Sequence, residues 1–160
     1  MSVTVFSTAL ITKSRPKSPT SWLLGTVGAD DRIALLEFSH ADTAGFTLPC
    51  VAIYPTSRQG RSSIAFSSQD TAIVGGWDGK ARLYKLPASI AFSDDIEAET
   101  TDSKTLVCTA VFRYHKESIQ SVGSTMFSVK SPVFIAVGGQ EGRISLWSAQ
   151  NVHKELTKLC

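Results

Sequence analysis

One stretch of sequence occurs twice, first as Ala72-Ile-Val-Gly-Gly-Trp-Asp-Gly-Lys-Ala-Arg-Leu-Tyr84 and again as Ile135-Ala-Val-Gly-Gly-Gln-Glu-Gly-Arg-Ile-Ser-Leu-Trp147. Each copy has an apolar run, a Gly-rich turn with an acidic residue before its last Gly, and alternating residues that end on a large aromatic. An acidic residue followed by Gly between two such runs is a strong signal for a hairpin. The sequence therefore predicts two closely related β-hairpins.

A weaker copy of the same pattern lies upstream, at Leu24–Leu36. Here Asp30 is the acid of the turn, and Asp31 stands where the other copies have the turn Gly. Repeated hairpins with a period of roughly 40–45 residues are typical of the blades of a β-propeller. The last two copies are further apart than this period, and we interpret the segment 87–104, which holds the acidic run Ser93–Asp102, as an inserted loop.

The chain as a whole is predicted to be all-β, because short runs rich in Val, Ile, Phe and Thr alternate with clusters of Gly, Pro, Ser and Asp. We expect a partial propeller of about three blades, each a four-stranded antiparallel sheet, over residues 1–148, with blades at about 2–38, 46–86 and 105–148. Only the segment Ala149–Leu159 within the tail, residues 149–160, shows helical promise. The predicted strands are Val3–Ile11, Trp22–Val27, Arg32–Phe38, Phe46–Tyr54, Ser62–Phe66, Ala72–Gly75, Lys80–Leu86, Thr105–Tyr114, Ile119–Phe127, Val133–Gly138 and Arg143–Ser148.

About three blades are fewer than the roughly four to eight with which known propellers close. Closure matters because it removes edge strands with unpaired backbone groups. Three explanations are compatible with the count: the chain is a fragment or shortened product of a longer propeller, which we favour; it assembles with other chains; or it closes as an unusually small ring. An open stack of blades is expected to aggregate or to recruit a partner by strand addition.

The composition is that of an ordinary globular chain, with 160 residues and a formal net charge of +2. This charge is too small to argue for nucleic acid or an anionic membrane as a partner, since both need clustered Lys and Arg. The apolar run Val3–Ile11 is too short to cross a bilayer. Cys50, Cys108 and Cys160 lack the spacing of a disulfide framework or a zinc site, and we expect the first two to be buried in strands.

The segment from about residue 62 to 148 resembles the WD-repeat superfamily. Within it, the Gly76-Trp77-Asp78 turn, the single His115 after an apolar strand and the terminal Gly142-Arg-Ile-Ser-Leu-Trp-Ser148 look like the C-terminal part of the ASTRA-associated WD-repeat proteins, whose animal relatives are called guanine nucleotide-binding protein beta subunit-like proteins. The resemblance implies a non-enzymatic scaffold, in the nucleus and/or the cytoplasm. Its implied partners are the co-chaperone subunits that mature phosphatidylinositol-3-kinase-like kinases, and chromatin-linked complexes.

The same resemblance implies structural roles for several residues. In the family pattern, a His in the loop that enters a blade and the acid of the tight turn share a hydrogen-bond network, so His115 is expected to pair with Glu141. Asp30 and Asp78 occupy the equivalent turns, and Trp147 is expected to pack between blades. Buried polar groups of this kind hold strands in position when they are satisfied.

Three further side chains raise the question of surface contacts. Trp77 sits at a turn, where it is either an exposed anchor for a partner or packed against a neighbouring loop. Arg82 and Arg143 alternate with apolar residues, and we expect both to project into solvent.

Motifs for catalysis are absent from the sequence, which has no Gly-x-Ser-x-Gly elbow, no HExxH and no P-loop. His40, His115 and His153 lack the spacing of metal ligands. We therefore predict no enzymatic activity, no cofactor and no metal site. Two rival hypotheses stay open: an adaptor or substrate receptor of another complex, such as a ubiquitin ligase, and a hydrolase built on a propeller, which would need clustered acids or a metal at the central channel.

Overall fold

The computed structural model describes residues 5–13, 21–41, 45–47, 50–55, 60–68, 70–86, 106–126, 133–149 and 156–158 of the chain. Within these residues there are thirteen β-strands and no helix, and the strands pair antiparallel in three sheets. The all-β prediction is confirmed for this part of the chain. None of it forms a helix of the length and hydropathy needed to span a membrane.

The first sheet has five strands: β1 (Val5–Lys13), β2 (Ser21–Gly28), β3 (Arg32–Ala41), β4 (Gly45–Thr47) and β5 (Cys50–Pro55). β1, β2 and β3 follow one another across the sheet. β3 then pairs with β4 at its C-terminal end and with β5 along its N-terminal part. The two short partners therefore share one long strand.

The second and third sheets are four-stranded meanders in which each strand pairs with the next one along the chain. The second sheet contains β6 (Arg61–Ser68), β7 (Thr71–Gly76), β8 (Lys80–Lys85) and β9 (Val107–Arg113). The third sheet contains β10 (Ile119–Met126), β11 (Val133–Gly139), β12 (Ile144–Ala149) and β13 (Leu156–Lys158). Successive antiparallel pairing is the arrangement that the short, turn-separated runs of the sequence favour.

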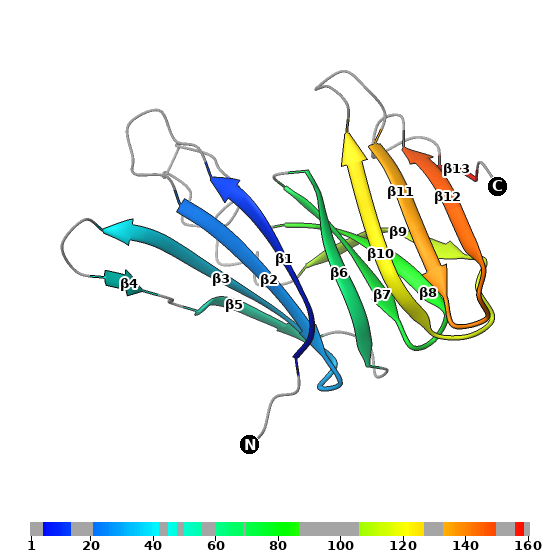
Figure 1. Ribbon diagram of the computed structural model, residues 1–160, viewed down its shortest axis with the longest axis horizontal. Helices are drawn as coiled ribbons and strands as arrows, with labels where there is room; N and C mark the ends of the chain where they lie inside the picture. The colour runs from blue at the N-terminus through cyan, green and yellow to red at the C-terminus, as the bar shows by residue number, and fades with distance from the viewer. Residues whose placement is uncertain are drawn as a thin grey trace.

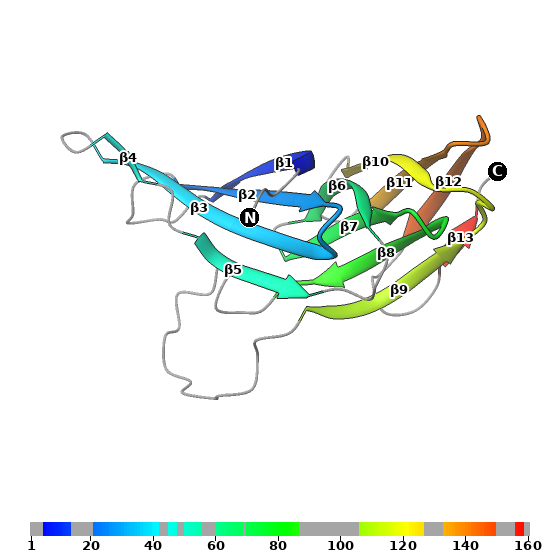
Figure 2. The same cartoon turned by 90° about the horizontal axis from the view of Figure 1, so that it is seen from below.

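The first strands of the three sheets lie side by side, with β6 between β1 and β10 (Figure 1). Two hydrogen bonds tie β6 to β10: Val122 N donates to Ser63 Oγ over 3.0 Å, and Ser124 Oγ donates to the Phe66 carbonyl over 2.8 Å. β1, β6 and β10 run along one side of the molecule, and β5 and β9 along the opposite side (Figure 2). The described sheets form an open fan and not a closed ring.

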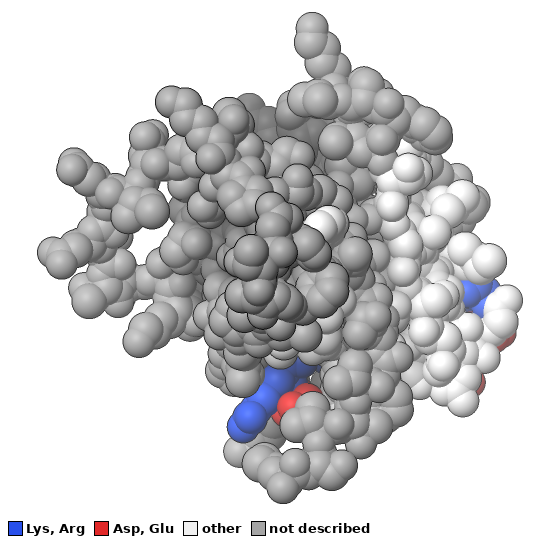
Figure 3. All heavy atoms as spheres, turned by 60° about the vertical axis from the view of Figure 1, so that its left-hand side comes forward, with Lys and Arg blue, Asp and Glu red and all other residues white. Residues whose placement is uncertain are grey.

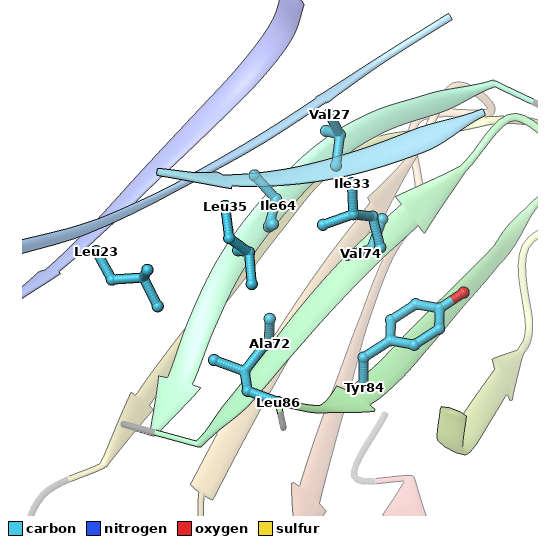
Figure 4. Packing of buried hydrophobic residues seen from close by; sticks show 9 residues of the cluster. All are labelled: Leu23, Val27, Ile33, Leu35, Ile64, Ala72, Val74, Tyr84 and Leu86. Carbon is cyan, nitrogen blue, oxygen red and sulfur yellow. The ribbon is translucent and has the colours of Figure 1, made fainter. Parts of the chain in front are cut away.

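Two apolar clusters fill the spaces between successive sheets. The first joins the first and second sheets and contains Leu23, Val27, Ile33, Leu35, Ile64, Ala72, Val74, Tyr84 and Leu86 (Figure 4). The second joins the second and third sheets and contains Ile73, Ala81, Leu83, Phe112, Ile119, Val133, Ile135 and Val137, with Trp147 packed against it. Alternate residues of the second sheet therefore enter different clusters, as the period of two in a strand requires.

The three hairpins β2–β3, β7–β8 and β11–β12 can be aligned by their cross-strand residue pairs, which we call rungs and number from the turn. The odd rungs, first and third from the turn, are Val27 with Ile33 and Gly25 with Leu35; Gly75 with Ala81 and Ile73 with Leu83; Gly138 with Ile144 and Ala136 with Leu146. The even rungs, second and fourth, are Thr26 with Ala34 and Leu24 with Leu36; Val74 with Arg82 and Ala72 with Tyr84; Val137 with Ser145 and Ile135 with Trp147. In both clusters, odd-rung side chains of one sheet meet even-rung side chains of the next.

The sheets differ from the predicted blade boundaries by one strand. The strand predicted at 46–54 opens the expected blade 46–86, yet β5 pairs with β3 in the first sheet. β9, placed in the expected blade 105–148, likewise pairs with β8 in the second sheet. The physical reason is that an antiparallel chain extends the edge it has just formed before it crosses over to begin a new inner strand.

Two other expectations are corrected. The tail predicted as helix contributes the strand β13, which pairs with β12 through Leu156–Lys158. Cys108, predicted to be buried, is exposed, because β9 is the outer edge of its sheet. The predicted insertion 87–104 lies outside the described residues, as does Cys160.

The tight turns of the three hairpins share one backbone conformation. Gly79 and Gly142 have φ values of 72° and 76°, and Asp31 takes a φ of 57° at the equivalent position of the first hairpin. Asp is among the few residues with a side chain that adopt this left-handed region. The substitution of Asp31 for the turn Gly therefore leaves the hairpin geometry intact.

The two turn glycines provide a matched test of how the sheets contact each other. A Cβ on Gly79 would lie 2.7 Å from the carbonyl oxygen of His115 and 2.8 Å from that of Glu117, whereas a Cβ on Gly142 would meet nothing within 4 Å. We predict that Gly142→Ala lowers the free energy of unfolding by about 1–2 kcal/mol, the cost of a left-handed residue with a Cβ. Gly79→Ala should cost clearly more in urea titrations. Equal losses would show that the β9–β10 loop does not pack on the β7–β8 turn.

Candidate functional site

A chain of hydrogen bonds links the β9–β10 loop to the third hairpin. His115 Nδ1 lies 2.7 Å from Glu141 Oε1 in the β11–β12 turn, and its Nε2 lies 3.0 Å from Ser145 Oγ on β12. Trp147 Nε1 donates to the same Ser145 oxygen over 2.9 Å. The structure thus brings together His115, Glu141 and Trp147, which the sequence analysis singled out. It adds Ser145, which that analysis missed.

The direction of the hydrogen bonds follows from the chemistry of the four groups. An ionised carboxylate only accepts, so Nδ1 of His115 carries the proton in its contact with Glu141. Its other ring nitrogen, Nε2, is hydrogen-bonded to the Ser145 hydroxyl, whose oxygen also accepts from the Trp147 indole. Every bond in the chain therefore has one donor and one acceptor, and each polarises the next.

Burial and close packing hold this network in place. His115 and Ser145 are buried, and a Cβ on Gly139 would collide with both Glu141 Oε2 and His115 Nδ1. Burial alone would raise the pKa of Glu141, but its own backbone amide and His115 stabilise the carboxylate, and the pKa lies below its ordinary value. Glu141 is therefore ionised at neutral pH.

Trp147 connects the network to the neighbouring sheet. Its ring packs edge-on against Phe112 of β9, with centroids 5.0 Å apart and planes at 65°, a favoured geometry for aromatic pairs. The prediction that Trp147 packs between adjacent sheets is confirmed by this contact. The indole thus has an apolar partner, Phe112, on the second sheet and a polar partner, Ser145, on its own sheet.

The second hairpin has an ionic cluster at the corresponding turn. Arg82 binds Asp78 in a two-point contact, with Nη1 3.0 Å from Oδ1 and Nη2 bonded to Oδ2. Arg61 Nη1 lies 3.9 Å from Asp78 Oδ1, and Lys80 Nζ lies 3.6 Å from Oδ2. The Arg61 side chain is only 1% exposed and that of Asp78 8%. Buried charges of this kind require partners.

This ionic cluster of the second hairpin occupies positions equivalent to those of the His115 network in the third hairpin. Arg82 stands on the rung that holds Ser145 in the third hairpin, and a Cβ on Gly76 would collide with Asp78 and approach Arg61 Nη1 at 2.7 Å. The Arg61 guanidinium therefore fills the place beside the turn glycine that the His115 ring fills in the third hairpin. The prediction that Arg82 projects into solvent is wrong, because its guanidinium pairs with the Asp78 carboxylate in the β7–β8 turn and its side chain is only 14% exposed.

The pKa values of the cluster follow from burial and pairing. Burial alone would raise the pKa of Asp78, but the hydrogen bond and charge of Arg82 and the charge of Arg61 bring it below its ordinary value. Arg61 has a lowered pKa, chiefly because its charge is taken out of water. The pKa of Arg82 is raised, first by its hydrogen bond to Asp78.

The remaining predicted residues lie at the same edge of the sheets. Asp30, the turn acid of the first hairpin, is exposed. Trp77 is 46% exposed, its amide donates to the Gly60 carbonyl over 3.0 Å, and a Cβ on Gly60 would lie 2.6 Å from its ring. Trp77 therefore packs against the chain before β6 and stays partly exposed, and its role as an anchor for a partner remains a prediction.

The polar side chains described at this edge bind one another and link neighbouring strands. The described part of the chain contains no group of three or more His, Cys, Asp and Glu side chains placed to hold a metal ion. In Figure 3, Lys or Arg atoms touch Asp or Glu atoms near the bottom of the view, and further coloured atoms of both kinds lie apart from one another at its right-hand side.

Comparisons with known proteins bear on the fold. No protein-family model matches the chain, and no curated protein sequence matches it. The fold is similar to that of a chain in two solved structures of a humanized mutant of the Chaetomium thermophilum Polycomb Repressive Complex 2, bound to the inhibitors GSK126 and GSK343. In both, the TM-score is 0.59 at 12% identity, and the match covers 90% of this chain and 28% of that chain. The chain thus spans less than a third of its structural neighbour.

The His115 network is testable by its contribution to stability. We predict that His115→Ala lowers the free energy of unfolding by about 1–3 kcal/mol, because Ser145 and Glu141 lose a buried partner. The neighbouring exposed Lys116→Ala is the control and should change it by less than about 0.5 kcal/mol. Urea titration measures both. Indistinguishable losses would mean that the network does not hold the loop to the hairpin.

The ionic cluster is testable by pH. Because the pKa of Asp78 is lower in the folded chain than in the unfolded one, its ionisation stabilises the fold above about pH 4, and this contribution is lost as pH falls through the folded value. Asp78→Asn should therefore cost about 3–5 kcal/mol at pH 7, and the difference from wild type should shrink under acid conditions. Asp30→Asn, at the equivalent but exposed turn position, is the control. A pH-independent loss for Asp78→Asn would contradict the assignment.

Proposed function

We propose that this chain is a section of a WD-repeat β-propeller that acts as a scaffold for protein–protein interactions. The observation that carries the proposal is the chain of hydrogen bonds from Trp147 through Ser145 and His115 to Glu141. It joins a His in the loop before a sheet to the acid of that sheet's tight turn, as the WD-repeat resemblance implies. The stacked four-stranded sheets are the second support.

The same hydrogen bonds favour a scaffold over an enzyme. A general base or metal ligand needs a ring nitrogen that can reach a substrate or ion. Both nitrogens of His115 are within hydrogen-bond distance of protein side chains, and the ring is buried. Asp78 is likewise committed to arginines. These acids and the histidine thus hold strands together in our proposal, and catalysis is not part of it.

A surface for a partner exists where the β7–β8 turn meets the β9–β10 loop. The two segments touch, since Gly79 lies against the carbonyls of His115 and Glu117. Each exposes an aromatic side chain, Trp77 at 46% and Tyr114 at 37%. Exposed Trp and Tyr on a rigid support are the commonest anchors of protein interfaces. We propose this Trp77–Tyr114 edge as the partner contact.

The identity of the partner rests on the sequence resemblance. We propose co-chaperone subunits for phosphatidylinositol-3-kinase-like kinases, in the nucleus and/or the cytoplasm, because the Gly76-Trp77-Asp78 turn and the terminal Gly142–Ser148 segment resemble the ASTRA-associated WD-repeat proteins. The structural neighbour comes from another chromatin-linked assembly, Polycomb Repressive Complex 2. That likeness supports the fold in this proposal and leaves the partner to experiment.

Affinity capture tests the proposal. We expect a tagged chain, expressed in cells of its own source, to retain co-chaperone subunits identified by mass spectrometry, and Trp77→Ala to reduce their recovery about tenfold or more, as loss of an interface anchor does. Val107→Ala, an exposed apolar residue on β9, is the matched control. Recovery of ubiquitin-ligase subunits in their place would favour the rival adaptor. Equal recovery by Trp77→Ala and wild type would remove the proposed edge.

A further inference from the structure

Two large aliphatic side chains are exposed on the outer face of the third sheet. On β12, Ile144 is 68% exposed and Leu146 is 39% exposed, while Ser145 and Trp147 between and beside them face the second sheet. Gly123 of β10 faces open space, because a Cβ there would meet no atom within 4 Å. Exposed large aliphatic side chains on a flat sheet face are a mark of an interaction surface.

The same positions are buried in the other two hairpins. Ile144 and Leu146 occupy the first and third rungs of β11–β12, which are the odd rungs. Their equivalents Ile33 and Leu35 in the first hairpin are buried under the second sheet, and Ala81 and Leu83 in the second hairpin are buried under the third sheet. The exposed face of the third sheet is therefore equivalent to the odd-rung faces of the first and second sheets, each of which is covered by the next sheet.

The first sheet presents the complementary face. The even rungs of the second and third hairpins hold Ala72 with Tyr84, and Ile135 with Trp147, and these side chains pack on the preceding sheet. The corresponding rung of the first hairpin holds Leu24 with Leu36, which are half-buried and have no described sheet before them. One end of the fan thus carries an odd-rung face and the other end an even-rung face.

We propose that a second copy of this chain covers these faces, with the first sheet of one copy stacked on the third sheet of the other. Ile144 and Leu146 of one copy would then pack against Leu24 and Leu36 of its partner copy, in the arrangement that already joins the sheets within the chain. A second copy is the occupant that the chain itself specifies, because the chain carries both halves of the contact.

A two-fold dimer covers the exposed faces of both the first and the third sheet in each copy. If two copies stack head to tail in both directions, each odd-rung face meets an even-rung face and no open end is left. Two copies bring six sheets into the ring, within the roughly four to eight blades that close a propeller. Closure also removes the apolar ends that favour unlimited stacking.

Mass measurement by sedimentation tests the proposal. We expect the purified wild-type chain of 17.2 kDa to sediment as a dimer, and Ile144→Asp to weaken dimerisation at least about tenfold, because it places an unpaired carboxylate in an apolar contact. Val107→Asp, at an apolar site on the outer strand β9 that is 59% exposed, is the control and should leave the dimer intact. Circular dichroism checks that each variant folds, and Ile144→Thr is the milder second variant.

A mixing experiment tests the head-to-tail geometry. Leu36→Asp should also weaken the dimer, since it alters the opposite face. A mixture of Ile144→Asp and Leu36→Asp chains should regain dimers, because one of the two contacts then joins unaltered faces. A monomeric wild-type chain at about 100 μM, a concentration far above the dissociation constant of a specific dimer, would overturn the proposal. So would a ladder of larger species, or a dimer insensitive to both substitutions.

Discussion

The face-to-face stacking of one sheet on the next is the contact on which this fold is built. Odd-rung side chains such as Ile33 and Leu35 enter the same cluster as even-rung side chains such as Ala72 and Tyr84, and burial of this apolar surface is the main stabilising term. The period of two in a β-strand allows the second sheet to serve both clusters. The second sheet therefore packs against a neighbouring sheet on each of its two faces.

The polar groups beside the turns differ between the second and third hairpins, although the sheets stack in the same way. The third hairpin uses a chain of hydrogen bonds from Trp147 to Glu141, and the second uses the ion cluster of Asp78 with Arg61 and Arg82. Both sets of side chains lie against a turn glycine, Gly139 in the third hairpin and Gly76 in the second. Since a half-satisfied buried network is costly, two unrelated sets of side chains at one position indicate that the position itself, an anchored turn, is what the fold requires.

Much of the fold could be predicted from the sequence, because strand positions depend on local patterns. The position of the turn at Asp30 and Asp31 followed from the repeated pattern, and the pairing of His115 with Glu141 was what the resemblance to WD repeats implied. The pairing of β5 with β3 was not accessible in this way, since a strand carries no local mark of which sheet it joins. The buried partners of Asp78 were missed for a related reason: Arg82 alternates like a surface residue, and Arg61 approaches only once the sheet has formed.

Methyl nuclear Overhauser contacts between sheets test the stacking most directly. Leu83 and Ile135 lie on different sheets and share one apolar cluster, so their methyl groups should show strong cross-peaks in a selectively labelled sample. The structure also requires that β9 and β10 give no backbone contacts of a paired ladder, since they belong to different sheets. Absence of the Leu83–Ile135 cross-peaks, together with ladder contacts between β9 and β10, would show one continuous sheet and contradict the stacked arrangement.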